Sequence, residues 1–389
     1  MSGLAKRKEA GKISVIDDFD YSTQSESYNR EFIKWRRKKN NLFAFSYEVN
    51  KNESIYVDGR GFVVKNAVDA ESEVLVRIFY ILGLALIAYV VLDTLFRKGL
   101  IMVLSRVGVD IHSNFFSDSL YGGSKEIVTV LMIVTLLKVL IPAAYLQKRF
   151  ALPRVVELMR TMHDPAGLVG AIAATLILCV ATSLPNAYSS EPTEIYTYFR
   201  NLNADIEVWG QFEFLVYSLF DIIVLSIFSE VFFRGAMFAV LRQFGDIFAV
   251  IITSITAAML TMDLREAPTM FCISLIASIG MLYSGSIFTA IAVNIIFKMY
   301  QLGLMVIQAD HADKMPLTRN VFMIAVLIAG AVMLLVVWIL HKYRGNKRIL
   351  VNYTSEMRFG ERLVYSVKIF PYSAVAVICF VYAIVRLVF

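Results

Sequence analysis

The sequence predicts an all-α fold, a polytopic helical membrane protein with eight or nine transmembrane helices. Of its 389 residues, 58% are hydrophobic, above the roughly 45–50% of a soluble domain. Several apolar runs approach or exceed the about 20 residues that a helix needs to cross the hydrocarbon core. Basic residues gather in the N-terminal tail and in alternate loops, as they do on the cytoplasmic side of membrane proteins.

Nine apolar segments make up the predicted bundle. They cover residues 74–96, 127–146, 167–184, 212–233, 247–262, 268–283, 287–306, 321–340 and 364–388. Residues 100–109 have the amphipathic pattern of a helix that lies on the membrane interface. No internal repeat is evident, which argues against a transporter built from two similar halves.

The charges predict the orientation of the bundle. If the tail is cytoplasmic, the basic residues at 148–160, Arg242 and the basic loop at 342–362 all fall on the same side. The acidic loop at 190–210 then lies outside, and the C-terminus is outside as well. The hydrophobic bulk excludes nucleic acid as the expected partner, despite a formal net charge of +6.

The N-terminal region is predicted to be a polar, basic cytoplasmic tail, residues 1–73. Residues 1–40 are too polar to bury a core and are expected to be disordered. The basic run 34–39 is expected to hold the tail in the cytosol. A compatible second role is contact with anionic lipid heads, at about 1 kcal/mol per basic residue. Strands are expected at 54–57 and 61–64, around the turn residues Asp58 and Gly59. Three further parts are expected: N-terminal transmembrane helices and loops at 74–210, a core at 211–306 and C-terminal transmembrane helices at 307–389.

Charged residues interrupt the fourth apolar segment. Glu230 and Arg234 stand four residues apart, so they share one helix face and can pair. A charge at mid-membrane costs about 2.5 to 3.5 kcal/mol, so such a pair is either a structural staple or part of a functional site. Lys138, Asp221 and Lys298 are further intramembrane charges, and mutual pairing is the expected arrangement. A proton or ion path built from these charges is the alternative.

Residues 229–235 read Ser-Glu-Val-Phe-Phe-Arg-Gly, close to the motif E-E-x-x-x-R, usually followed by glycine, of the CAAX-protease and bacteriocin-processing (CPBP) family of intramembrane endopeptidases. The region 229–298 resembles this family. The segment 236–245 fits the flank of that motif. The second and third family motifs, F-x-x-x-H and H-x-x-x-N, fall on Ala258, Met262, Asn294 and Lys298. The resemblance implies a CPBP-like core within residues 211–306.

The chain departs from the family where the chemistry is done. The resemblance implies that the first Glu and first His activate water, and that the second His and the Asn hold the oxyanion. Those positions carry Ser229, Met262, Asn294 and Lys298 here, whereas the second Glu and the Arg are kept as Glu230 and Arg234. A thioether has no titratable proton, so Met262 cannot act as a base.

Three functions follow as hypotheses. The first is a degenerate, non-proteolytic CPBP-like protein that binds membrane lipids, a membrane peptide or a protein partner. The second is an active endopeptidase with rearranged residues, in which Ser229 is the nucleophile and Lys298 the base. The third is a transporter or accessory subunit.

In the first hypothesis, Glu230 lies between Arg234 and Lys298 in an electrostatic clasp. No cofactor is expected, and no metal, because Glu with Ser, Met and Asn makes a poor zinc site. Cys179, Cys272 and Cys379 fit the role of small buried hydrophobes. The resemblance places the protein in the plasma membrane of a bacterium, in bacteriocin processing or immunity.

Overall fold

The fold is all-α, as the sequence predicts, with two short antiparallel hairpins added. The computed structural model describes residues 24–38, 41–44, 54–57, 61–64, 67–113, 120–184, 211–310, 315–344 and 357–388. Within these ranges, seven helices are long and apolar enough to cross a membrane, and a helix pair bent by 73° makes an eighth if it is one span. The protein is therefore a polytopic helical membrane protein, and the described residues contain fewer than the nine spans of the higher estimate.

Two of the predicted spans are corrected by the structure. The fifth becomes α13 (Asp246–Met259), which has 14 residues. Such a helix rises about 21 Å, short of the ~30 Å hydrocarbon core. The ninth is broken into α17 (Phe359–Val367) and α18 (Tyr372–Val388). Pro371 stands between the two helices, where it removes a backbone donor and restricts the residue before it.

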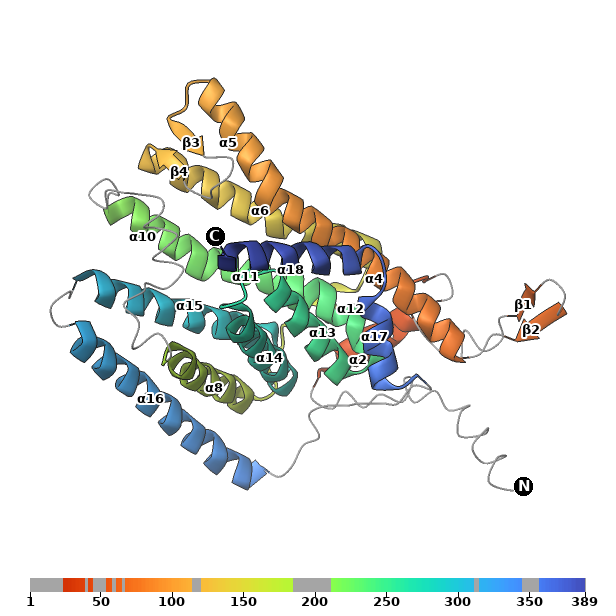
Figure 1. The fold of residues 1–389 in the computed structure, drawn as a ribbon. Coiled ribbons are helices and arrows are strands. Elements are labelled where there is room, and N and C mark those ends of the chain that lie inside the picture. Colours follow the sequence, from red (N-terminus) through yellow and green to blue (C-terminus); the bar gives the residue numbers. More distant parts are fainter. Residues whose placement is uncertain are drawn as a thin grey trace.

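The first span is longer than predicted and includes the segment expected on the interface. Helix α4 (Ala67–Val91) continues through a π-helical turn, η1 (Leu92–Phe96), into α5 (Arg97–Arg106). The expectation of a separate interfacial helix at 100–109 is therefore wrong. One face of α5 packs with β3 (Ile111–Ser113), β4 (Leu120–Gly122) and α6 (Ser124–Phe150), at the top of Figure 1. Ile101 is buried in this small second core, which accounts for the amphipathic pattern of the segment.

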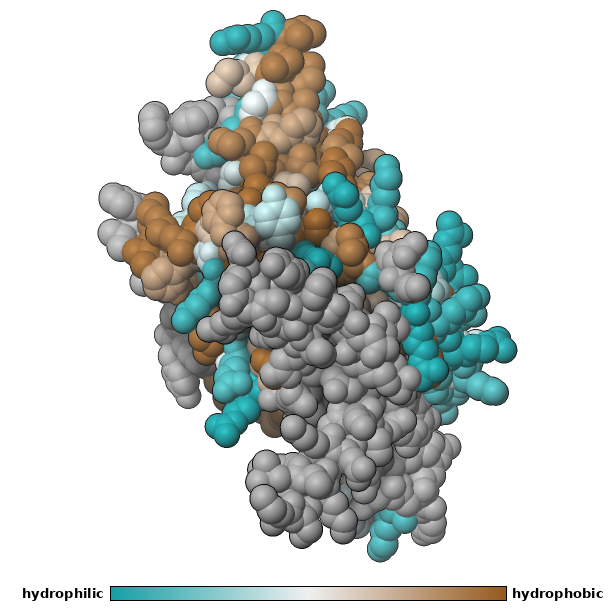
Figure 2. All heavy atoms as spheres, turned by 90° about the vertical axis from the view of Figure 1, so that its right-hand side faces the viewer, coloured by the Kyte–Doolittle hydropathy of each residue, from teal (hydrophilic) through white to brown (hydrophobic). Residues whose placement is uncertain are grey.

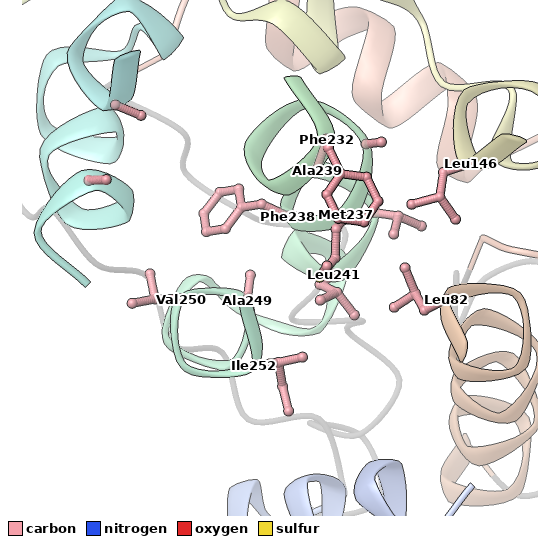
Figure 3. Packing of buried hydrophobic residues seen from close by; sticks show 14 of the residues in the cluster. Leu82, Leu146, Phe232, Met237, Phe238, Ala239, Leu241, Ala249, Val250 and Ile252 are labelled. Atoms are coloured by element: carbon pink, nitrogen blue, oxygen red, sulfur yellow. The ribbon is translucent and has the colours of Figure 1, made fainter. Parts of the chain in front are cut away.

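The centre of the bundle is one long helix with local changes of pitch. Its parts are α10 (Gln211–Leu219), η4 (Phe220–Leu225), α11 (Ser226–Glu230), η5 (Val231–Phe238), α12 (Ala239–Leu241) and η6 (Arg242–Phe244). Both η4 and η5 are π-helical. Leu82 of α4 and Leu146 of α6 point toward Met237 and Leu241 of this helix (Figure 3), and all four side chains are fully buried. The family motif therefore lies where this helix enters its buried half, since residues 234–244 are all buried.

A glycine allows a neighbouring segment to approach this central helix. A Cβ added to Gly235 would lie 3.3 Å from the carbonyl oxygen of Glu157, in the short helix α7 (Arg154–Leu158). That separation is tighter than almost all real Cβ contacts. Glycine directly after the motif arginine is thus explained by packing against α7.

The remaining helices surround the centre. They are α8 (Pro165–Ser183), α14 (Ala267–Ser284), α15 (Ile287–Asp310) and α16 (Met315–Arg344). The Asp164 carboxylate caps α8 by accepting a hydrogen bond from the Ala166 N–H, and Pro165 occupies the first turn, as helix starts favour. Helix α16 packs along α8 at the edge of the bundle (Figure 1). Its other faces expose large apolar side chains, such as Val321, Ile328 and Leu335, which suits contact with lipid tails.

The N-terminal region contains a helix where disorder is predicted. Helix α2 (Glu26–Arg36) begins at Ser25, whose hydroxyl accepts a hydrogen bond from the Tyr28 N–H. Phe32 and Trp35 are buried, and the Trp35 Nε1–H donates to the Phe150 carbonyl at 3.0 Å. The expectation of disorder is therefore wrong for the described part of the tail. Burying three aromatic rings compensates for the polar composition of the segment.

The basic run of the tail is only partly free to contact lipid. Arg36 is 2% exposed, whereas Lys34, Arg37 and Lys38 are exposed.

The predicted hairpin is confirmed as β1 (Ser54–Val57) paired with β2 (Gly61–Val64). Figure 2 looks at the molecule from this end and shows hydrophilic side chains gathered on one flank, beside an apolar stretch of surface.

The acidic loop at 190–210 and residues 345–356 of the basic loop lie outside the described residues. The orientation of the protein in the membrane thus stays a prediction.

Candidate functional site

A cavity of about 190 Å³ lies against the central helix. Five of the candidate residues line it, namely Ser229, Glu230, Arg234, Asn294 and Lys298. Other polar or aromatic groups in its wall are Tyr89, Lys138, Thr261 and Ser274. The sequence-predicted motif positions therefore meet in one place, with Met262 as the exception.

Glu230 and Arg234 form a buried ion pair along one face of the helix. Arg234 Nη1 lies 3.1 Å from Glu230 Oε1 and 3.0 Å from Oε2, and both side chains are 3% exposed. The amide Nδ2 of Asn294 donates to Glu230 Oε1 at 3.2 Å. Arg234 Nη2 donates to the carbonyl and hydroxyl oxygens of Ser274, at 2.9 and 2.8 Å. A carboxylate so surrounded acts as a counter-ion, because removing either partner would leave an uncompensated buried charge.

Lys298 pairs with a different carboxylate from the one predicted. Its Nζ donates to Asp221 Oδ1 at 2.8 Å and to the Asp221 carbonyl at 2.9 Å. The predicted clasp around Glu230 is thus corrected, since the second donor to Glu230 is Asn294. The physical reason is that Asp221 is a second intramembrane acid and would be costly without a cation.

Lys138 forms a third ion pair beside the cavity. Its Nζ lies 2.9 Å from Asp93 Oδ1 and 5.4 Å from the centroid of the Tyr89 ring. A cation at that distance from an aromatic ring is attracted by the ring quadrupole. The expectation that the intramembrane charges pair is therefore confirmed for Lys138, Asp221, Glu230, Arg234 and Lys298.

Each ion pair touches a π-helical segment. Asp93 lies in η1, Asp221 lies in η4, and Arg234 lies in η5. Short π-helical segments inside α-helices occur frequently at functional sites. Here they coincide with the charged wall of the cavity.

Ser229 lines the cavity, whereas Met262 does not. Ser229 Oγ donates to the Ser226 carbonyl at 3.1 Å and accepts from Asn294 Nδ2 at 3.1 Å. Met262 is 5% exposed and has a φ of 51°, at the turn that follows α13. Leu260 and Thr261 line the cavity in that region, and Met262 does not.

Within the part of the chain that the structure describes, no group of three or more His, Cys, Asp or Glu side chains could hold a metal ion. The cysteines are free thiols, with Cys179 and Cys379 buried and Cys272 half-buried. Neither Cys179, Cys272 nor Cys379 lines the cavity.

Sequence reasoning missed the partners rather than the charged residues themselves. Asp93 is an acid inside the first apolar run, and that position is a signal that could have been used. Ser274 and Tyr89 carry no comparable signal, because serine and tyrosine are frequent in this chain's helices and their contacts depend on how the helices pack.

The fold and the site together describe a helical membrane protein with a partly open cavity that three ion pairs adjoin. Residues 211–300 match the family model described as Type II CAAX prenyl endopeptidase Rce1-like. The match runs from α10 into α15 and includes every candidate site residue, so the resemblance to the CPBP family is confirmed in this part of the chain. No curated protein and no solved structure matches the chain.

Proposed function

We propose that this protein is a catalytically inactive CPBP-type membrane protein that binds a membrane peptide, lipid or protein partner in its cavity. The observation that carries this proposal is the state of Glu230, the acid kept from the family motif. Arg234 and Asn294 both donate to its carboxylate, and the side chain is 3% exposed. The Glu230 carboxylate therefore serves as the counter-ion of Arg234.

The lack of a base supports the loss of proteolysis. A general base must lie about 2.6 to 3.2 Å from the proton that it removes, directly or through one water. None of the cavity-lining residues within the described chain is a histidine. The amide of Asn294, at one of the family's oxyanion positions, is engaged as well, since its Nδ2 donates to Ser229 and Glu230.

A rearranged endopeptidase is the alternative, and the contacts of its two residues argue against it. Lys298 Nζ and Asp221 Oδ1 are 2.8 Å apart, and an ammonium group has donors but no acceptor. Ser229 Oγ donates its hydrogen to the Ser226 carbonyl instead of to a base. A transporter would need a continuous polar path, whereas the charges described here close into separate pairs.

A cleavage assay tests the proposal. The purified protein is placed in liposomes with prenylated peptides and with leader-type peptides, and products are followed by mass spectrometry. We expect no product beyond that of the matched Glu230→Ala and Ser229→Ala variants. A CPBP endopeptidase with an intact E-E-x-x-x-R motif serves as the positive control. Turnover by the natural protein that is lost in either variant would overturn the proposal.

A further inference from the structure

We infer that Lys138 and Lys298 together form an oxyanion site, which binds the carboxylate or phosphate group of a ligand inside the cavity. This inference rests on the proposed binding role of the same cavity. Both lysines line the cavity, and the contacts of their ammonium groups leave them able to bind a further anion.

The charges around the cavity are arranged in two layers. Lys138, Lys298 and Arg234 line it together with a single carboxylate, that of Glu230. Asp93 and Asp221, the partners of the two lysines, are not among the lining residues. The inner layer is therefore cationic although the pairs are neutral as a whole. A cleft lined by an excess of one sign, with low-dielectric walls, attracts ions of the other sign.

The two lysines have hydrogen-bond donors left over. An ammonium group has three N–H donors. Lys298 directs its Nζ to two oxygens of Asp221, and Lys138 directs its Nζ to one oxygen of Asp93 and lies over the Tyr89 ring. Within the described contacts, each lysine thus keeps at least one N–H for a ligand. Charge-assisted hydrogen bonds of this kind are about twice as strong as neutral ones.

Exposure separates the lysines from the motif pair. The side chains of Lys138 and Lys298 are 18% and 16% exposed, whereas those of Glu230 and Arg234 are 3% exposed. The partner acids Asp93 and Asp221 are 26% and 25% exposed but do not line the cavity. An anion inside the cavity therefore meets the lysines and not the buried arginine.

The size of the cavity limits what can enter it. A volume of about 190 Å³ corresponds to roughly six water molecules at about 30 Å³ each. It admits a carboxylate or phosphate group with a short length of chain, and it is too small for a helical segment. The rest of any larger ligand must lie outside the cavity.

Matched amphiphiles test the charge of the ligand. Thermal unfolding of the natural protein in neutral detergent is followed with oleate, with oleyl alcohol and with oleylamine, which share one chain. A ligand that binds the folded state raises the unfolding midpoint, and the stabilisation grows with the logarithm of one plus the ratio of free ligand concentration to Kd, so that titration gives an apparent affinity. We expect an apparent affinity for oleate at least tenfold above that for the alcohol or the amine. Equal effects of the three would overturn the inference.

Free anions distinguish the two sources of the oxyanion. Acetate and inorganic phosphate are titrated in the same assay. Stabilisation by either one, with saturation, identifies a soluble anion as sufficient. Stabilisation by oleate alone identifies the head group of an amphiphile. Both results support the site, and stabilisation by no anion would refute it.

Variants that remove whole ion pairs locate the effect. Lys298→Met with Asp221→Leu, and Lys138→Met with Asp93→Leu, avoid leaving an unpaired charge. The matched control is Arg242→Met with Asp246→Leu, because that pair is 1% exposed on both sides and does not line the cavity. We expect at least a tenfold loss of oleate affinity in each cavity variant and none in the control. Affinities equal to that of the natural protein in both cavity variants would contradict the inference.

A second measurement needs no substitution, in case the double variants do not fold. The natural protein is treated with a membrane-permeant amine reagent, and labelling of Lys138 and Lys298 is quantified by mass spectrometry. Oleate should reduce that labelling at least twofold relative to oleyl alcohol, and unchanged labelling would contradict the site. Peptide cleavage would refute the proposed function and leave anion binding standing, whereas loss of the oleate preference without cleavage would refute the anion site alone.

Discussion

Lys298 and Asp221 are joined across 77 positions of sequence, on two different helices. Their pairing depends on how α15 packs against the central helix. Because the two side chains are 16% and 25% exposed, removing either residue should cost less than the about 3 to 5 kcal/mol that is typical of a fully buried pair. The double variant should lose less than the sum, with a coupling of about 0.5 to 3 kcal/mol for residues in contact.

A double-mutant cycle checks this pairing. Unfolding by denaturant in detergent is measured for Lys298→Met, Asp221→Leu and the combined variant. A second cycle replaces Asp221→Leu with Glu230→Leu, and its coupling should be smaller because Arg234 and Asn294 already hold Glu230. A larger coupling to Glu230 than to Asp221 would restore the originally expected clasp.

Glu157 is a buried acid outside the membrane-spanning helices, at 5% exposure. Burial raises the pKa of Glu157 from 4.5 to about 7, against a smaller opposing effect of the Arg154 charge. Between those two values the folded protein holds a proton that the unfolded chain has lost. The contribution of Glu157 to stability is thus complete below about pH 4.5 and falls as the pH rises toward 7.

The Glu157→Gln variant removes this titration. We expect the unfolding midpoint of the natural protein to fall more steeply than that of the variant between pH 4.5 and pH 7. Above pH 7 the two slopes should agree. Parallel curves across the whole range would show that Glu157 titrates normally in the folded protein.

At the scale of elements, α2 depends on aromatic contacts with the bundle. Trp35→Ala removes a buried ring and the hydrogen bond to the Phe150 carbonyl. Such a truncation of a core aromatic residue costs about 3 to 5 kcal/mol. Because α2 packs at one end of the chain, the loss should undock this helix and leave the transmembrane bundle folded.

Hydrogen exchange of the amides in Glu26–Arg36 measures the docking. Protection there should drop sharply in Trp35→Ala, while α6 and the central helix keep their protection. Lys34→Ala is the matched control, since Lys34 is an exposed neighbour on the same helix. Fast exchange of these amides already in the natural protein would contradict the docked position of α2.

The sequence predicted the elements that depend on local pattern. Apolar runs predicted most of the membrane-spanning helices. The β-branched residues around Asp58 and Gly59 predicted a hairpin whose two strands have the residues that the structure shows. Helix α2 also has local sequence signals, namely a serine at its N-cap and aromatic residues at i, i+4 and i+7 (Tyr28, Phe32 and Trp35). The prediction of disorder rested on the polar composition of the tail alone. The break between α17 and α18 could have been foreseen from Pro371. The failure of α13 to reach the length of a full span could have been foreseen from the shortness of its apolar run.

The contacts between helices were beyond the sequence. Ser229, Glu230, Arg234, Asn294 and Lys298 line one cavity. The choice of Asp221 over Glu230 as the partner of Lys298 depends on the rotation of α15. The exclusion of Met262 from the cavity likewise depends on a left-handed turn at the end of α13. Neither feature has a local sequence signature.

For the whole molecule, the remaining prediction is its orientation. The charge asymmetry predicts a cytoplasmic N-terminus, so Lys38 should lie inside and Arg106, at the far end of the first span, should lie outside. Cysteines placed at these two exposed positions are treated in intact cells with a membrane-impermeant thiol reagent. Arg106→Cys should label and Lys38→Cys should not. The natural protein, whose cysteines are buried or half-buried, is the background control, and the reverse pattern would invert the topology.

The central claim is that Glu230 serves as a counter-ion and is not a poised acid. A hydrophobic carbodiimide, which modifies protonated carboxyl groups in apolar surroundings, tests this directly at pH 6.5, with adducts located by mass spectrometry. Glu157 is the internal positive control, because burial raises its pKa to about 7. We predict an adduct on Glu157 and none on Glu230, with labelling of Glu230 gained when Arg234→Met removes its partner. Labelling of Glu230 in the natural protein, at a level comparable with Glu157, would contradict the account.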